Sequence, residues 1–300
     1  MKWPAFIFTA PILLAIGCKS HYDTTTEPFT AVKTGNSMEH GKNLVFNVCG
    51  QCHYNEDANS FIGEKIRDLP GFMGKVYSAN LTDSKRYGIA GYKDAEIYYL
   101  LKRGIAKDGR FIPYMVRPNM ADADINDIIV YLRSGDEPVK AKDTVAGKSH
   151  LSLLGKLATK VSGKPLPLKK NIKRPSPDNT IAYGRYLVDI IGCYHCHSKS
   201  ILSLDYLEPE KSKGYMAGGM KWNIEGDKIR ASNITPDKAT GIGNYTMADF
   251  RKAVREGEAP GGRVLHYPMR RFKHLTDTQT DAIYAYLMTL PPKDHKVKGH

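Results

Sequence analysis

The chain has 300 residues, a length that ordinarily divides into two domains. Its 44 lysine and arginine residues outnumber 31 aspartate and glutamate residues, and a formal net charge of +13 can indicate nucleic-acid binding. The excess is concentrated in residues 138–180, where ten basic residues stand against two acidic ones. This segment therefore contributes +8 of the net +13. Because the N-terminal pattern described next indicates export, no nucleic-acid partner is expected.

The N-terminal segment has the pattern of an export signal. Residues 1–17 combine a basic start, a short apolar run and small residues before Cys18. The run is too short to span a bilayer, and no later stretch is long and apolar enough to do so. Because the position of Cys18 resembles a bacterial lipoprotein cleavage box, we expect residues 1–17 to be removed and Cys18 to carry lipid. The alternative is an ordinary signal peptide followed by a stray cysteine.

Two five-residue strings share the pattern Cys-x-x-Cys-His, at residues 49–53 and 193–197. This pattern is the attachment signature of c-type haem. The two thiols of a string bond to the two vinyl groups of one haem, and the adjacent histidine is the proximal iron ligand. The strings therefore predict two covalent haem c groups, attached through Cys49, Cys52, Cys193 and Cys196 and with iron bound by His53 and His197.

Two other chemistries use paired cysteines. A thioredoxin-type redox pair usually follows a strand in a βαβ unit, and the sequence shows no such unit. A structural zinc site would have to combine the two pairs. Cys49 and Cys193 are 144 positions apart, and each pair has its own histidine and its own downstream motifs. Haem attachment is therefore the favoured interpretation.

The motifs after each string recur in the same order. An asparagine that begins an Asn-x-Thr string is followed eight positions later by a Gly-Ile pair and twelve positions later by a tyrosine. These positions are Asn80 and Tyr92 in the first copy and Asn233 and Tyr245 in the second. Such an internal repeat predicts two copies of one fold.

Each copy has a helical pattern. Apolar residues at helical spacing predict helices over residues 94–104, 122–132, 246–257 and 276–287. The first and third end at a glycine, and the fourth begins with a capping box at Thr276. Neither copy shows the alternating pattern of a strand, so the sequence predicts an all-α chain.

The basic segment lies between the two copies. Its prolines at positions 165, 167, 175 and 177 are typical of a connector that wraps or bridges two lobes. Two interpretations of its positive charge stay open. The segment is either a docking surface for an acidic redox partner or a solvated linker.

Both copies resemble class I cytochrome c domains. The runs NITPD at 233–237 and TGIGNY at 240–245 are similar to the haem-pocket loop of multi-haem cytochrome subunits that serve membrane-associated dehydrogenases. Residues 80–83 carry a shorter version of this loop. The resemblance implies weaker roles in the haem pocket for four side chains, namely Asn80, Tyr92, Asn233 and Tyr245.

The resemblance also implies a domain layout and a function. Two tandem class I cytochrome c domains, residues 36–136 and 180–292, are joined by the basic, proline-containing linker 137–179. In this family type the chain carries electrons and does no substrate chemistry of its own. We therefore expect an electron carrier, not an enzyme, that works between periplasmic or membrane donor and acceptor proteins. It would be exported to the periplasmic face and held at the membrane by its lipid.

The second axial ligand of each iron is expected to be a methionine placed before the last helix. Met269, in a Tyr-Pro-Met string, stands where the family places this ligand, and Met115 stands at nearly the same distance from its own closing helix. In the first copy the commoner family spacing falls near Ile112, and Met120 is a rival that we interpret as core. Weaker alternatives in the second copy are Met216, Met220 and His266, whereas His195 lies inside the attachment string.

A di-haem peroxidase is the alternative function. Such an enzyme has a similar length and a similar gap between its two strings, but it needs one iron with a vacant or displaceable distal site. Here both copies offer a methionine at the same place, so the two haem sites look alike instead of specialised. A carrier is the favoured function.

Overall fold

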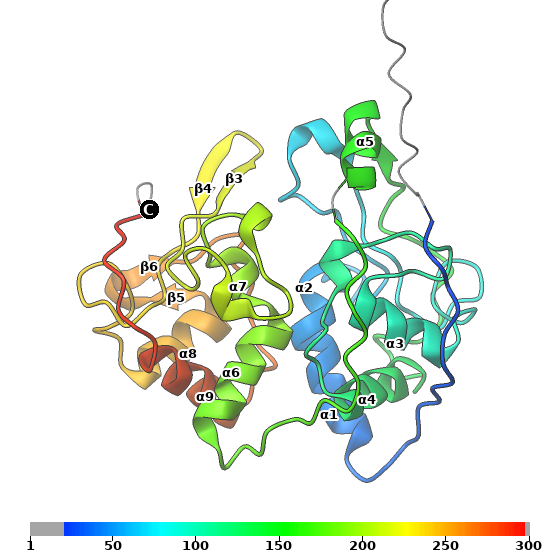
Figure 1. Ribbon diagram of the computed structural model, residues 1–300, viewed down its shortest axis with the longest axis horizontal. Helices are drawn as coiled ribbons and strands as arrows, with labels where there is room; N and C mark the ends of the chain where they lie inside the picture. The colour runs from blue at the N-terminus through cyan, green and yellow to red at the C-terminus, as the bar shows by residue number, and fades with distance from the viewer. Residues whose placement is uncertain (1–20, 162, 298–300) are drawn as a thin grey trace, which may run out of the picture.

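The computed structural model describes residues 21–161 and 163–297. The predicted signal segment 1–17 and the predicted lipidation site Cys18 lie outside the described residues. The described chain is mostly helical with a few short strands (Figure 1), an arrangement compatible with the cytochrome c fold that the resemblance implies.

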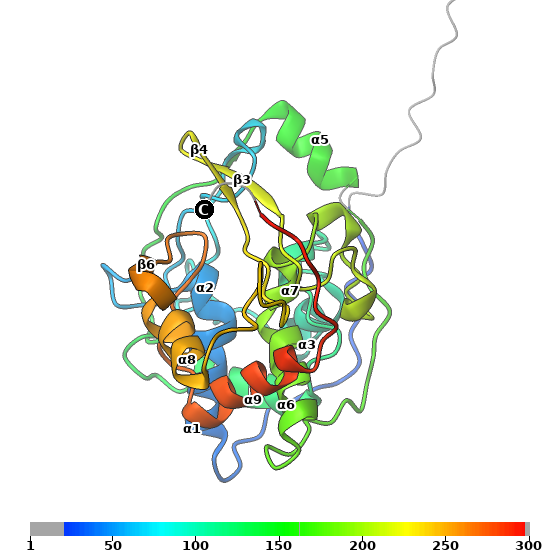
Figure 2. The same cartoon turned by 90° about the vertical axis from the view of Figure 1, so that its left-hand side faces the viewer.

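The helices follow one another in an order that repeats. They are α1 (Ser37–Leu44), which continues through a π-helical turn (Val45–Cys49) into α2 (Gly50–His53), then α3 (Asp94–Arg103), α4 (Asp122–Leu132), α5 (Leu153–Val161), α6 (Thr180–Ile191), α7 (Cys193–Cys196), α8 (Met247–Glu256) and α9 (Asp277–Met288). Short 3-10 turns, among them Gly71–Met73 and Pro113–Met115, connect them. Figure 2 shows the same elements from the side of the second half.

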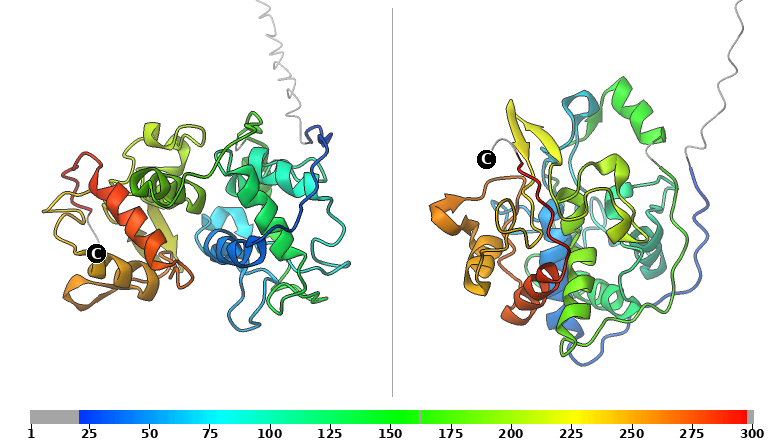
Figure 3. Two further views of the ribbon diagram at one scale, coloured as in Figure 1. Left: turned by 90° about the horizontal axis from the view of Figure 1, so that it is seen from below. Right: turned by 60° about the vertical axis from the view of Figure 1, so that its left-hand side comes forward.

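In each half, the helix that leads into the Cys-x-x-Cys-His string packs across the last helix of that half. These pairs are α1 with α4 and α6 with α9, seen from below in Figure 3. A glycine lies at each crossing. A Cβ atom on Gly41 would lie 2.0 Å from the carbonyl oxygen of Asp127, and one on Gly184 would lie 1.8 Å from that of Ala282. Only glycine permits so close an approach of the two backbones.

The four predicted helices are confirmed. Gly104 and Gly257 end α3 and α8 in the left-handed conformation, with φ of 77° and 79°. The capping box at Thr276 is present, because its hydroxyl accepts the N–H of Gln279 while the side chain of Gln279 accepts the N–H of Thr276.

The expectation of a purely helical chain was wrong in detail. The described residues include three two-stranded antiparallel ribbons: β1 (Gly74–Lys75) with β2 (His150–Leu151), β3 (Lys221–Ile224) with β4 (Asp227–Arg230), and β5 (Glu258–Ala259) with β6 (Arg263–Val264). The longest is a hairpin whose turn residues, Glu225 and Gly226, have φ of 55° and 107°. In β3 the apolar residues Trp222 and Ile224 alternate with the exposed Lys221 and Asn223, a four-residue strand signal that the prediction missed, whereas β4 shows no such alternation.

The segment 137–179 lies along the first half and contains structure that was not predicted. The N–H of Leu166 donates to the carbonyl of Arg103, and the N–H of Asn171 donates to the carboxylate of Asp122 at 2.8 Å. β2 and the helix α5 also fall within this segment. The sequence did not predict α5, because the segment around it is rich in prolines and lysines and was interpreted as a connector. The leucines of α5 nevertheless have helical spacing.

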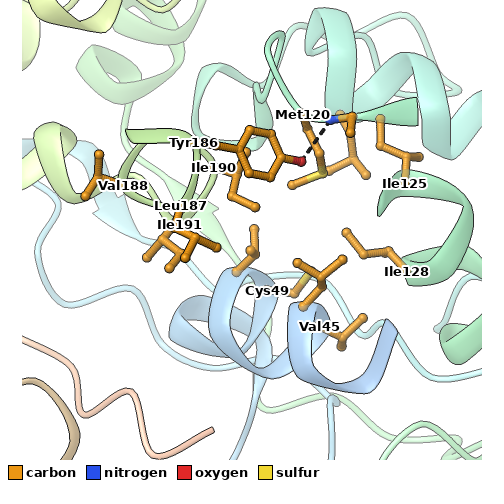
Figure 4. Close-up of a cluster of buried hydrophobic side chains, with 14 of the residues drawn as sticks. Val45, Cys49, Met120, Ile125, Ile128, Tyr186, Leu187, Val188, Ile190 and Ile191 are labelled. Atoms are coloured by element: carbon orange, nitrogen blue, oxygen red, sulfur yellow. Dashed lines mark hydrogen bonds between the residues drawn. The ribbon is translucent and has the colours of Figure 1, made fainter. Parts of the chain in front are cut away.

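One apolar cluster joins the two halves of the described chain (Figure 4). Tyr186 of α6 lies beside Met120 and accepts the N–H of Ala121 at 3.0 Å, and its hydroxyl donates to Asp124 of α4. The relative placement of the halves is therefore set by shared packing in addition to the chain that connects them.

Asp189 lies at the edge of this contact. Its carboxylate accepts a hydrogen bond from the side-chain amide of Asn119, on the first half, at 2.8 Å. Burial raises the pKa of the Asp189 carboxyl from 3.8 to about 6. The folded protein therefore holds the proton more tightly than the unfolded chain does.

This shift predicts a pH-dependent cost in stability. Well below pH 3.8 the carboxyl is protonated in both states and costs nothing, whereas stability falls as the pH rises from there through about 6. Asp189→Asn keeps the acceptor for Asn119, so it should raise the free energy of unfolding by up to about 3 kcal/mol at about pH 7 and leave it nearly unchanged at about pH 3. Denaturant titrations at both pH values measure the difference, and an equal effect at both would contradict the assignment.

No helix in the described ranges is long and apolar enough to cross a membrane.

Candidate functional sites

Each Cys-x-x-Cys-His string occupies a helical turn at the end of a long helix. The first lies where the π-helical turn passes into α2, and the second forms α7 after α6 ends at Gly192, whose φ is 86°. Within each string the cysteines are three residues apart, so they share one face of the turn. All four are free thiols.

The two histidines of the strings make the same hydrogen bond. The Nδ1 of His53 lies 2.7 Å from the carbonyl oxygen of Ala79, and the Nδ1 of His197 lies 2.8 Å from that of Ser232. Because a carbonyl only accepts, each Nδ1 carries the proton and each Nε2 keeps its lone pair. This tautomer, held by a backbone carbonyl, is the arrangement of a histidine that binds a metal through Nε2.

The chemistry of the thiols argues against the two other cysteine functions. Burial raises the pKa of Cys49 and of Cys193 to about 12, whereas a redox-active pair needs a thiol of lowered pKa. Among the described residues, the side chains close enough to bind one metal ion form one group, made up of His40, Asp124 and Asp127. It contains no cysteine. The two pairs therefore do not form a zinc site together.

The two repeated asparagines are buried and hold the loop that carries the carbonyl partner of each histidine. The Oδ1 of each accepts both the N–H and the hydroxyl of the threonine two residues later, at 2.6–3.0 Å. The Nδ2 of Asn80 donates to the carbonyl of Lys142 at 3.0 Å, and that of Asn233 donates to Lys293 at 2.7 Å. Each asparagine thus ties its loop to the segment that follows the last helix of its half.

The repeated tyrosines are partly buried and also mark equivalent places. The carbonyl of Tyr92 accepts a hydrogen bond from Arg133 at 2.5 Å, just after α4, and the carbonyl of Tyr245 accepts one from Tyr284 in α9 at 2.6 Å. Each tyrosine therefore joins its loop to the last helix of the same half.

Met115 and Met269 lie in equivalent turns. The N–H of Met115 donates to the carbonyl of Ile112 at 3.1 Å, and that of Met269 donates to His266 at 3.0 Å. Both side chains are partly buried. Met120, by contrast, is fully buried in the core, as Leu275 is at the matching place of the second half. This correspondence supports Met115, and not Met120, as the counterpart of Met269.

The weaker alternatives lie elsewhere in the second half. Met216 and Met220 are buried at 0% and 7% exposure, whereas His266 is exposed. His195 is half-buried inside the attachment string with its Nε2 inaccessible to solvent, and desolvation lowers its pKa well below the usual value, so its ring is neutral.

The two strings lie close to each other across the contact between the halves. The side chain of Gln51 donates to the carbonyl of Ile191 at 3.3 Å, and the guanidinium of Arg117 donates to the carbonyl of Ile190 at 2.8 Å. Burial raises the pKa of Cys196 to about 12, and the carboxylate of Asp68, on the first half, adds to this shift. Each string is thus within electrostatic reach of the other half.

Comparison with known proteins finds relatives at modest identity over most of this chain. No family model matches it. The fructose dehydrogenase cytochrome subunit of Gluconobacter japonicus is 27% identical over 288 residues, which are 89% of this chain and 55% of that protein. The gluconate 2-dehydrogenase cytochrome c subunit of Pantoea cypripedii is 28% identical over 258 residues, or 82% of this chain and 57% of that protein. The relatives of this chain are cytochrome c subunits.

A further relative is the diheme cytochrome c-type protein of Cereibacter sphaeroides, which is 28% identical over 111 residues, or 36% of each chain. The chain spans about half the length of the two dehydrogenase subunits it matches. These relatives confirm the predicted resemblance to cytochrome subunits of membrane-associated dehydrogenases and support a role in electron transfer. They do not favour the peroxidase alternative.

The donor set fits haem c. Each string presents two free thiols on one face of a turn, and the Nδ1 of each adjacent histidine is hydrogen-bonded to a loop carbonyl. Thiols of this kind supply the two thioether bonds, and an unprotonated Nε2 supplies one axial bond to iron.

Sequence reasoning missed Asp68 and Arg117, which act across the contact between the halves. The hydroxyl of Tyr267 donates to Asp68 at 3.1 Å, so the loop that carries Met269 is held by the first half of the chain. The two residues of this hydrogen bond are 199 positions apart, and no local motif marks either of them.

Proposed function

We propose that this protein carries electrons through two haem c groups, one bound at each Cys-x-x-Cys-His string, as a subunit or partner of a membrane-associated dehydrogenase. The observation that carries the proposal is the duplicated histidine geometry, in which Nδ1 of His53 and of His197 donates to a loop carbonyl at 2.7 and 2.8 Å. The names of the relatives support the same role.

When bound, haem c supplies reversible one-electron chemistry. The chain would hold the two groups in two tandem class I cytochrome c domains, residues 36–136 and 180–292, with 137–179 as their linker. Met115 and Met269 would supply the second protein ligand of each iron. Filling both axial positions with protein side chains keeps other ligands from the iron, which suits a carrier and not a peroxidase.

The N-terminal sequence supports a proposal for where in the cell the protein works. We propose that residues 1–17 direct export and that lipid on Cys18 holds the chain at the periplasmic face of a membrane. Its electron donor would be a dehydrogenase, as the names of the relatives suggest, and its acceptor a second redox protein.

The stoichiometry of haem tests the proposal. The mass of the exported protein should exceed that of the polypeptide by two haems. Cys52→Ala should weaken attachment at the first string alone and Cys196→Ala at the second alone, because each string is served by its own helix and its own loop. Intact-mass spectrometry and the haem stain of a denaturing gel measure both effects.

Cys18→Ser is the matched control, since it removes a cysteine that belongs to neither string and should leave two haems attached. A wild-type protein that carries one haem, or none, would refute the proposed function.

A further inference from the structure

The helix α5 places leucines on the outside of the molecule. Leu153, Leu154 and Leu157 are exposed to 84%, 61% and 59%, and Phe72 on the neighbouring turn is exposed to 52%. These residues, named here the α5 patch, are four of the twelve large apolar side chains that are exposed in the described part of the chain. Figures 1 and 2 show α5 at the outer edge of the molecule. Apolar side chains gathered in this way usually mark a contact surface.

The packing of α5 explains why this face points outward. A Cβ atom on Gly155 would lie 2.4 Å from the carbonyl oxygen of Met73, so this side of the helix lies against the turn Gly71–Met73. Leu153 and Leu157 are each two residues from Gly155, and at 100° per residue they lie on the opposite side. The N–H of Ser152 also donates to Met73 at 3.1 Å, which holds the start of the helix in place. The outward position of the leucines is therefore fixed by the backbone contact.

The surroundings of the α5 patch are basic. Residues 144–177 contain eight lysine and arginine residues and no aspartate or glutamate. Lys156 on α5 itself is exposed, as are Lys148 before it, Lys164 after it and Lys75 on β1. A short helix with an apolar face flanked by lysines matches the chemistry of a bilayer surface with anionic headgroups.

The first described residues lie near the end of α5. The N–H of Tyr22 donates to the carbonyl of Gly109 at 2.7 Å, and the ring of Tyr22 lies 6.4 Å from that of Phe111. A Cβ atom on Gly163, two residues after α5, would lie 3.2 Å from the same Phe111 ring. Cys18 precedes Tyr22 by four positions, so a lipid on it would be attached within about 14 Å of Tyr22.

We propose that the α5 patch rests on the surface of an anionic phospholipid bilayer and forms a second membrane contact beside the lipid on Cys18. The proposal deepens the proposed function, because it rests on the export and tethering of the cytochrome. A lipid alone leaves a protein free to rotate about its attachment, whereas two adjacent contacts fix which face the protein turns to the membrane.

The test uses the haem-loaded chain with Cys18→Ser, exported behind a cleavable signal so that no lipid is attached. Sucrose-loaded vesicles of phosphatidylcholine with an equal part of phosphatidylglycerol are the probe, and sedimentation gives the bound fraction. The test variant combines Leu153→Gln, Leu154→Gln and Leu157→Gln. The matched control combines Val32→Gln, Ile181→Gln and Val264→Gln, which alter three side chains of 58%, 41% and 45% exposure outside the patch.

We expect the unsubstituted chain to bind these vesicles and to bind more weakly at high salt or without phosphatidylglycerol. The test variant should lose at least about tenfold in partition coefficient, while the control should stay within about twofold. Absence of vesicle binding by the unsubstituted chain, or equal losses in both variants, would overturn the proposal. So would a test variant that keeps vesicle binding but no longer co-purifies with a dehydrogenase, since the patch would then be a protein interface.

The visible spectrum of each variant separates this proposal from the proposed function. Unchanged haem spectra show that both variants are folded and loaded, so a failure to bind vesicles would bear on the α5 patch alone. A chain that binds vesicles but carries no haem would refute the proposed function and leave the membrane contact standing.

Discussion

Met269→Ala is expected to convert the haem of the second half from low-spin to high-spin and to lower its reduction potential. A thioether ligand stabilises the reduced iron, so its loss should cost on the order of 0.1 V or more within the ~0.8 V range that axial ligands span. The haem of the first half should keep its spectrum. Visible spectroscopy, including the methionine-to-iron charge-transfer band, and a redox titration measure the two effects.

The surroundings of Met269 make this variant interpretable. Its loop is held by the hydrogen bond from Tyr267 to Asp68 and by the bond from its own N–H to the carbonyl of His266. Neither bond involves the side chain of Met269, so the loop should keep its conformation after the substitution. Tyr267→Phe is the matched control for the loop, because it removes the bond to Asp68 and leaves the thioether in place.

Two variants test the corresponding assignment in the first half. Met115→Ala should open that haem to a high-spin state in the same way. Met120→Ala should leave the spectrum unchanged and destabilise the fold by about 2–5 kcal/mol, because Met120 is fully buried in the core. The opposite pattern would identify Met120 as the methionine ligand of the first iron and would leave the proposed electron-carrier function unchanged. A native first haem that already binds carbon monoxide would refute the carrier function.

Asp124→Ala is expected to destabilise the protein by about 3–5 kcal/mol, the cost of removing one partner from a buried charge pair. The carboxylate of Asp124 is completely buried and accepts a hydrogen bond from Arg174 at 2.6 Å, and the Nε2 of His40 lies 3.1 Å from it. It also accepts the hydroxyl of Tyr186 at 2.5 Å. Because these groups come from α1, the segment 137–179 and α6, the substitution should loosen the contact between the halves together with the first half itself.

Denaturant unfolding followed by circular dichroism measures the loss. Glu258→Ala is the control, since the ion pair between Glu258 and Lys252 lies in solvent and should contribute little to the free energy of unfolding. The loss of stability in Tyr186→Phe should lie between those of Asp124→Ala and Glu258→Ala. This substitution removes one hydrogen bond and keeps the pair of Asp124 and Arg174. Similar losses for Asp124→Ala and Glu258→Ala would show that the buried cluster does not hold the halves together.

The sequence by itself determined the features that depend on neighbouring residues. The spacing within each Cys-x-x-Cys-His string predicted the donor set, and the structure adds the histidine geometry that suits it. Helical spacing and capping residues predicted the four helices, because caps and amphipathic faces are local properties of the chain. The repeated motifs indicated two similar halves, each with a glycine where its first and last helices cross.

Only the tertiary structure decided what depends on contacts between distant residues. The hydrogen bond from Tyr267 to Asp68 and the cluster around Asp124 join segments that no local pattern relates, so sequence reasoning had no signal for them. The outward face of α5 was hidden for a similar reason. The spacing of its leucines suits a buried helix equally well, and the contact of Gly155 with the backbone of Met73 is what turns them toward solvent.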